Sequence, residues 1–176
     1  MKKFIWVVIA MSVLAVSSQA QEVPAADISA GYSFFRAGGS NGVNLNGFNA
    51  TAAYNANSWF GVVGDFGFYG GSPSGVSVNA FTYTAGPRFS IRKSERIVPF
   101  AQATFGASHL SASFAGVSGS ANPFTYSVGG GADVALSRSG KVALRPEVEY
   151  FGLRENGGTS NCVRLAVGIV YHIGQR

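Results

Sequence analysis

The sequence of 176 residues has few charges, one cysteine and, after its first twenty residues, no long apolar run. Charged residues make up 12% of the chain, about half of their usual share in a soluble domain. The lone Cys162 excludes an intramolecular disulfide. Without a run of about 18 apolar residues, the chain beyond residue 20 cannot form a transmembrane helix. Its apolar surface must therefore be covered by a large core or by lipid.

The sequence also lacks the features of a nucleic-acid-binding surface. The net charge is +5, but no patch combines basic residues with interleaved aromatic residues. The 24 glycines disfavour long helices, because each costs about 1 kcal/mol in a helix relative to alanine. We therefore expect an all-β chain with no nucleic-acid partner. Several basic residues fall at the ends of expected strands: Arg36, Arg92, Lys93, Arg96, Arg138 and Lys141.

The first twenty residues have the organisation of an export signal. Two lysines precede an apolar stretch from Phe4 to Val16, and the small-residue cleavage site Ser18–Ala20 follows. The alternative is a membrane anchor, but an apolar run of about 13 residues is short for a span of about 20. We therefore predict a signal peptide over residues 1–20 and a mature domain over residues 21–176.

Behind this signal, apolar residues alternate with small or polar residues at a period of two. Such alternation places apolar side chains on one face of a strand and the others on the opposite face. It is clearest in the last segment, where Val163, Leu165 and Val167 alternate with Arg164 and Ala166. The pattern predicts eight strands: Ile28–Arg36, Leu45–Asn55, Trp59–Tyr69, Val78–Ile91, Ile97–Ser108, Phe124–Leu136, Leu144–Tyr150 and Cys162–Gly174.

The connections between these strands alternate in length. Three are short and polar (residues 55–58, 92–96 and 137–141), whereas the others are longer loops rich in glycine and serine, including 109–122 and 154–161. This asymmetry is typical of outer-membrane barrels. A sheet whose strands cross lipid must close into a barrel, because an open edge would leave backbone amides unpaired in hydrocarbon. We therefore predict an eight-stranded antiparallel up-and-down transmembrane β-barrel.

The charged residues inside the expected strands fall on the face opposite the aromatic residues. A basic residue facing lipid would cost about 2–4 kcal/mol at the midplane, whereas in the lumen acids and bases can pair. An eight-stranded barrel is just wide enough for its side chains to fill, which favours a plugged, structural interior over a narrow water or ion path. The predicted interior polar network consists of Asp65, Arg88, Asp133, Arg145, Glu147, Glu149 and Arg164.

Other residues suggest sharper hypotheses. His109 and Ser111 resemble the His-x-Ser pair of outer-membrane lipid A deacylases, but their flanking sequence differs and residues 105–125 contain no acid to orient the histidine. His172 shares its segment with no second histidine, so we expect it at the periplasmic rim rather than on a metal. We expect no catalytic residue, cofactor or metal. The candidate interfacial aromatics are Trp59, Phe60, Tyr150, Phe151 and Tyr171.

Five stretches resemble the outer-membrane β-barrel domain of OmpA-like and related small bacterial surface proteins: Trp59–Asp65, Ala85–Phe89, Pro99–Gln102, Gly129–Val134 and Leu165–Tyr171. The resemblance covers roughly residues 25–174. It implies an outer-membrane location in a diderm bacterium, contact with outer-membrane lipid and assembly by the barrel assembly machinery. Many relatives end on an aromatic residue, whereas here five residues follow Tyr171. We expect no further domain after the barrel, so no wall-tethering role is carried over.

We therefore expect a small monomeric outer-membrane protein with a structural or surface-interaction role. One alternative is a narrow porin-like channel for ions or small solutes, which conductance measurements would distinguish. A second alternative is a barrel enzyme acting on lipid A. The third is a soluble exported barrel with a hydrophobic cavity, as in lipocalins, which requires the aromatic face to point inward.

Overall fold

The computed structural model describes residues 23–38, 42–72, 75–94, 96–114, 117–137, 139–155 and 157–174, so the expected signal peptide lies outside the described residues. No helix among the described residues is long and apolar enough to cross a membrane. The strands are β1 (Ala26–Ala37), β2 (Val43–Asn55), β3 (Phe60–Gly71), β4 (Ser77–Ser90), β5 (Ile97–Phe114), β6 (Val117–Ala121), β7 (Phe124–Ala135), β8 (Val142–Glu155) and β9 (Gly158–Ile173).

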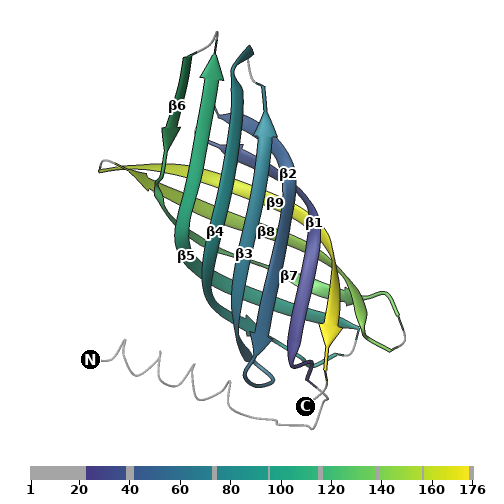
Figure 1. The fold of residues 1–176 in the computed structure, drawn as a ribbon. Coiled ribbons are helices and arrows are strands. Elements are labelled where there is room, and N and C mark those ends of the chain that lie inside the picture. Colours follow the sequence, from purple (N-terminus) through teal and green to yellow (C-terminus); the bar gives the residue numbers. More distant parts are fainter. Residues whose placement is uncertain are drawn as a thin grey trace, which may run out of the picture.

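The strands form one closed, tilted barrel (Figure 1). Each strand pairs with its neighbours in an antiparallel manner, and β1 pairs with β9 from Ala26↔Ile173 to Ala37↔Cys162, which closes the sheet. In a closed barrel the backbone groups that face hydrocarbon are hydrogen-bonded within the sheet. This closure confirms the antiparallel barrel predicted from the alternating pattern.

The short strand β6 is the outer part of the sixth barrel strand. Both β6 and β7 pair with β5 in one continuous register, as Leu110↔Ala121 and Ala107↔Phe124 show. The strand is interrupted at Pro123, which has no N–H to donate, although the carbonyl of Pro123 still accepts a hydrogen bond from the N–H of Ser108 at 3.1 Å. The barrel therefore has eight strands, as predicted, with one extension.

Two segments that were expected to be loops are β-hairpins, so these expectations were wrong. Residues 109–122 complete β5 and form β6, whose last pair is Phe114↔Val117. Residues 154–161 complete β8 and open β9, with Glu155↔Gly158 as the last pair. Both hairpins extend beyond the part of the barrel in which every strand has two neighbours. A strand outside lipid needs no continuous apolar face, so the alternation that marks the other strands disappears here.

The two faces of the barrel wall differ sharply in chemistry. Large apolar side chains cover the outer face and remain about half exposed, such as Tyr32, Phe66 and Leu165. The inner face buries many polar and charged residues, among them Gln102 and Thr104. This arrangement contradicts the lipocalin-like alternative, because that fold requires the aromatic face to point inward.

The two ends of the barrel can be told apart by their connections. Residues 56–59, 91–96 and 136–141 join consecutive strands at one end. The same end holds Ala25 and Gly174, whose backbones are hydrogen-bonded at 3.3 Å. From the opposite end the hairpins β5–β6 and β8–β9 extend beyond the barrel wall, and the longer excursions of outer-membrane barrels lie on the extracellular side. We therefore assign the end that holds Ala25 and Gly174 to the periplasm and the hairpins β5–β6 and β8–β9 to the outer surface.

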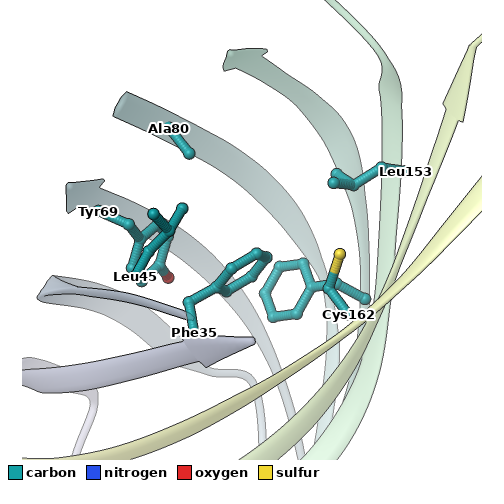
Figure 2. Close-up of a cluster of buried hydrophobic side chains, with 7 residues drawn as sticks. Phe35, Leu45, Tyr69, Ala80, Leu153 and Cys162 are labelled. Carbon is teal, nitrogen blue, oxygen red and sulfur yellow. The ribbon is translucent and has the colours of Figure 1, made fainter. Parts of the chain in front are cut away.

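An apolar cluster fills the lumen near its outer end. Figure 2 shows Phe35, Tyr69 and Cys162 on different strands, and all three belong to this cluster. The rings of Phe35 and Tyr69 stack with centroids 4.7 Å apart, and those of Phe35 and Phe151 meet edge to face at 5.6 Å. The cluster consists of Phe35, Leu45, Tyr69, Ala80, Phe151, Leu153 and Cys162.

The position of Phe151 corrects a prediction. It was expected at the membrane interface beside Tyr150, but it is fully buried in the lumen. Adjacent residues of a strand point to opposite faces. Because Tyr150 is on the outer face, Phe151 must face inward with Glu149 and Leu153.

Candidate functional site

The most distinctive region of the molecule is the polar lumen below the apolar cluster. Its charged residues come from five strands: Asp65 from β3, Arg88 from β4, Asp133 from β7, Arg145, Glu147 and Glu149 from β8, and Arg164 from β9. Each of these seven residues is at most 6% exposed. Burying this many charges is tolerated only if they pair with one another and their donors and acceptors are hydrogen-bonded.

Arg164 is the centre of the first group of charges. Its Nη1 and Nη2 atoms donate to the two carboxylate oxygens of Asp65 at 2.8 and 2.6 Å. Nη2 also donates to Glu147 Oε1 at 2.8 Å and to Glu149 Oε2. The hydroxyl of Tyr69 accepts a further bond from Nη1 at 3.0 Å. One guanidinium thereby holds three carboxylates together.

Two glycines make room for this group. A Cβ atom at Gly67 would overlap the hydroxyl of Tyr69, and a Cβ atom at Gly129 would overlap the side chain of Glu149. Both glycines lie on the inner face of their strands, next to the side chains that they accommodate. Glycine is needed at these positions because a side chain would not fit, and not because the backbone adopts a conformation that favours glycine.

Arg145 and Asp133 form the second group. The Nε and Nη2 atoms of Arg145 donate to the two carboxylate oxygens of Asp133 at 2.6 and 2.8 Å. Nη1 donates to Thr51 Oγ1 at 3.2 Å on the opposite wall. The Cζ atom of Arg145 also lies 4.8 Å from the ring centroid of Phe100. Such a bidentate, ring-supported geometry satisfies a buried guanidinium well.

Gln102 connects Arg88 to the Arg164 group. Its Oε1 atom accepts a hydrogen bond from Arg88 Nε at 2.8 Å, and its Nε2 atom donates to Glu149 Oε1 at 2.7 Å. The Cζ atom of Arg88 lies 4.6 Å from the ring centroid of Phe100. The alternation along residues 97–108 predicts an inward Gln102, but it gives no signal that this amide bridges two charged residues.

A third group closes the periplasmic end of the lumen. Asp27 pairs with His172, whose Nδ1 atom lies 2.5 Å from Asp27 Oδ1, and with Asn55, whose Nδ2 atom donates to Asp27 Oδ2 at 2.9 Å. Arg92 approaches the same carboxylate at 3.9 Å. Burial lowers the pKa of Arg92, although the charge of Asp27 opposes this shift.

Asp27 was absent from the predicted network because the first strand was expected to begin at Ile28, two residues after its start at Ala26. The signal was present, since Asp27 has the same parity along the strand as Ser29 and Ser33, which lie on the inner face. His172 lies near the end of β9 at this periplasmic end.

The acids around Arg164 have the spacing of a metal site. One oxygen each from Asp65, Glu147 and Glu149 lies within 4.8 Å of the others. However, the guanidinium of Arg164 contacts all three carboxylates. It therefore supplies the positive charge that a bound cation would otherwise provide.

The expected interfacial aromatics lie on the outer face, apart from Phe151. Trp59 stacks on Phe89 with ring centroids 5.9 Å apart, and Phe60 packs against the same ring at 5.6 Å. Tyr171 is exposed near the end of β9. Tyr150 lies toward the outer end, where its hydroxyl donates to Asn161 Oδ1 at 2.6 Å.

The His109 and Ser111 pair lies on the β5–β6 hairpin. His109 is exposed, and its Nδ1 atom lies 2.7 Å from Asn122 Oδ1. Ser111 pairs with Asn79 on one side and Ser120 on the other. Among the described residues, no carboxylate forms an ion pair or hydrogen bond with His109, so its imidazole lacks the acid that orients a catalytic histidine.

Comparison with known proteins agrees with this architecture. The structure is similar to that of Neisserial surface protein A, with a TM-score of 0.71, 15% identity and coverage of 85% of this chain and 97% of the other. It is also similar to the attachment invasion locus protein Ail of Yersinia pestis (TM-score 0.62, 20% identity, coverage of 85% and 98%). The N-terminal barrel domain of OprF from Pseudomonas aeruginosa gives a TM-score of 0.60 at 12% identity, with coverage of 86% and 100%.

The sequence itself identifies the family. No curated protein matches it significantly. Residues 6–172, nearly the whole chain, match the family model described as the outer membrane protein beta-barrel domain. This chain therefore belongs to that family of outer-membrane β-barrel proteins.

Proposed function

We propose that this outer-membrane protein is a closed, non-conducting barrel with a structural role. The observation that carries the proposal is the filling of the lumen. Arg164 cross-links three carboxylates from two strands, and the aromatic cluster around Phe35 and Phe151 lies on its outer side. The periplasmic side holds the pairs Arg145–Asp133 and His172–Asp27.

An ion crossing this lumen would meet two barriers in series. It would first have to separate charge pairs that are strengthened by the low dielectric of the interior. It would then have to cross an apolar constriction, where an ion loses its hydration without gaining polar partners. The same contacts tie opposite walls of the barrel together, which supports a structural role.

Planar-bilayer recording on the purified, refolded chain tests the closed state. We expect no stable conductance steps, and discrete steps would show a porin-like channel instead. The structural role is tested separately by heat-modifiable gel migration of Arg145→Met and Glu147→Gln. Each variant should unfold at a lower temperature than the wild type, and unchanged heat resistance in both would contradict a structural network.

The outer hairpins support a surface-interaction role as a second candidate. At the tip of the β5–β6 hairpin, Phe114 and Val117 are 58% and 76% exposed. Ail has been crystallised with a heparin analogue, sucrose octasulfate, but the outer connections of this chain carry little charge. We propose that any contact here is apolar, so Phe114→Ser with Val117→Ser should reduce attachment of expressing cells to a hydrophobic surface.

We further propose that the chain is a monomer assembled by the barrel assembly machinery and that it has no catalytic activity. The pairing of β1 with β9 supports the monomer, because the barrel closes within one chain. The hydrogen bond of His109 to Asn122 supports the absence of catalysis. Mass spectrometry of lipid A from expressing cells tests this, and a mass change that depends on His109 and Ser111 would contradict it.

A further inference from the structure

Exposed basic side chains gather at one place on the periplasmic end. Lys93 and Arg96 lie in the turn between β4 and β5, and Lys141 lies in the turn between β7 and β8; all three are exposed. The two turns are neighbours, because β5 pairs with both β4 and β7. A hydrogen bond of 2.8 Å from the N–H of Ala135, the last residue of β7, to the carbonyl of Arg96 joins the first turn to the strand that leads into the second.

These three cations have no acidic partner within the described residues. None of them forms an ion pair there, since the ion pairs on this side of the barrel join Asp27 to Arg92 and His172 and Asp133 to Arg145. The side chain of Arg92 is only 9% exposed and lies against Asp27 at 3.9 Å, so it belongs to the lumen rather than to this surface. The same turns also contain Glu95 and Arg138 in the sequence, and both lie outside the described residues.

The cations are concentrated on one side of one end. The remaining periplasmic turn, residues 56–59, carries no charge. At the outer end, the exposed charged residues of the described chain are Arg36 on β1 and Arg154 and Glu155 on β8, so an acid accompanies the two bases there. The strongest exposed positive charge of the described molecule therefore faces the periplasm, beside β4, β5, β7 and β8.

The depth of these residues matches that of lipid headgroups. Ile91 precedes Lys93 by two residues, Ile97 follows Arg96 directly, and Leu136 opens the second turn; each of these apolar side chains is about half exposed on the outer face. The stacked pair of Trp59 and Phe89 lies at the same end, and tryptophan is typical of the membrane–water interface. Lysine and arginine next to such a band can lay their apolar stems along it and place their charge in the headgroup layer.

We propose that Lys93, Arg96 and Lys141 form a binding site for the phosphate groups of anionic phospholipids in the periplasmic leaflet. A cluster of basic residues beside the hydrocarbon edge attracts anionic lipid. The position favours lipid over a polymer in the periplasmic space, because the cations flank the lipid-facing residues. The site would hold anionic lipid against β4, β5, β7 and β8 rather than evenly around the barrel.

Lipid retention by the full chain tests this site. The protein is refolded into phosphatidylethanolamine vesicles that contain phosphatidylglycerol, extracted in mild detergent, and the retained lipids are quantified by mass spectrometry. The variant Lys93→Gln/Arg96→Gln/Lys141→Gln should lower the retained ratio of phosphatidylglycerol to phosphatidylethanolamine, by up to about fivefold for each charge removed. Arg154→Gln is the matched control, because it removes one exposed charge at the opposite end and should leave the ratio unchanged.

The proposal is overturned if the triple variant keeps the wild-type ratio, or if Arg154→Gln lowers the ratio as much as any single periplasmic substitution. It is also overturned if the three cations control binding to isolated peptidoglycan but not lipid retention. Heat-modifiable migration verifies that each variant is folded. If the triple variant does not fold, the three single variants are measured instead, and an unchanged ratio in all of them rejects the site.

Discussion

Arg164 of β9 and Asp65 of β3 form a bidentate ion pair, with Nη1–Oδ1 and Nη2–Oδ2 distances of 2.8 and 2.6 Å, although they are 99 residues apart in sequence. The strands β2 and β1 lie between β3 and β9 in the sheet. The pair therefore crosses the lumen instead of joining neighbouring strands. It forms only when the barrel is closed, so its free energy stabilises the complete fold rather than a single hairpin.

Removing Arg164 should strongly destabilise the barrel. In Arg164→Met, the carboxylates of Asp65, Glu147 and Glu149 lose their shared cation and remain buried. Breaking a buried ion pair on one side costs about 3–5 kcal/mol, so urea unfolding followed by tryptophan fluorescence should show a loss of this size. Adding Asp65→Asn and Glu149→Gln should recover part of the loss. A single variant as stable as the exposed-site control Arg154→Met would contradict this.

Gly67 should be intolerant of alanine, whereas Gly64 on the same strand should tolerate it. A Cβ atom at Gly67 overlaps the hydroxyl of Tyr69, while the nearest atoms to a Cβ at Gly64 are 3.9 Å away. Gly67→Ala should lower the free energy of unfolding by about 1–3 kcal/mol through overpacking, and Gly64→Ala should not lower it. Equal urea midpoints for the two variants would show that Tyr69 moves aside without cost.

Truncation of Phe151 should cost more than truncation of Phe124. Phe151 is fully buried in the lumen, whereas Phe124 is 52% exposed on the outer face. Phe151→Ala leaves a cavity that the barrel wall cannot fill, with an expected loss of about 3–5 kcal/mol. Lipid chains can fill the space left by Phe124→Ala. Thermal unfolding in vesicles compares the two variants, and a larger loss for Phe124→Ala would place the apolar cluster outside the lumen.

An arginine on the lipid face should be costly at mid-height and tolerated at the rim. Val167 is exposed on β9 opposite Tyr32 and Pro146 in the middle of the wall, whereas Ile173 is the last residue of that strand. Val167→Arg should cost about 2–4 kcal/mol and Ile173→Arg about 0–1 kcal/mol. Folding yields in vesicles at increasing urea concentration measure both, and equal costs would mean that β9 does not span the hydrocarbon layer.

The side on which a residue lies was predictable from the sequence because alternation is a local property of a strand. Asp133 was placed inward by counting along a single segment, the same count places Gln102 and Thr104 inward, and the structure buries all three. The same count applied to Phe151 would have placed it in the lumen. The outer hairpins were not predictable in this way, because strands such as β6 need no apolar face beyond lipid and resemble loops in composition.

By itself, the sequence determined the two chemical faces, the order of the strands and their closure in a membrane. These features follow from a period of two and from the cost of unpaired amides in hydrocarbon. Only the tertiary structure decided which charges meet. Arg164 reaches Asp65 and Gln102 reaches Glu149 because the tilt and register of the closed barrel bring side chains from non-adjacent strands to the same height, and no local pattern along the chain encodes that stagger.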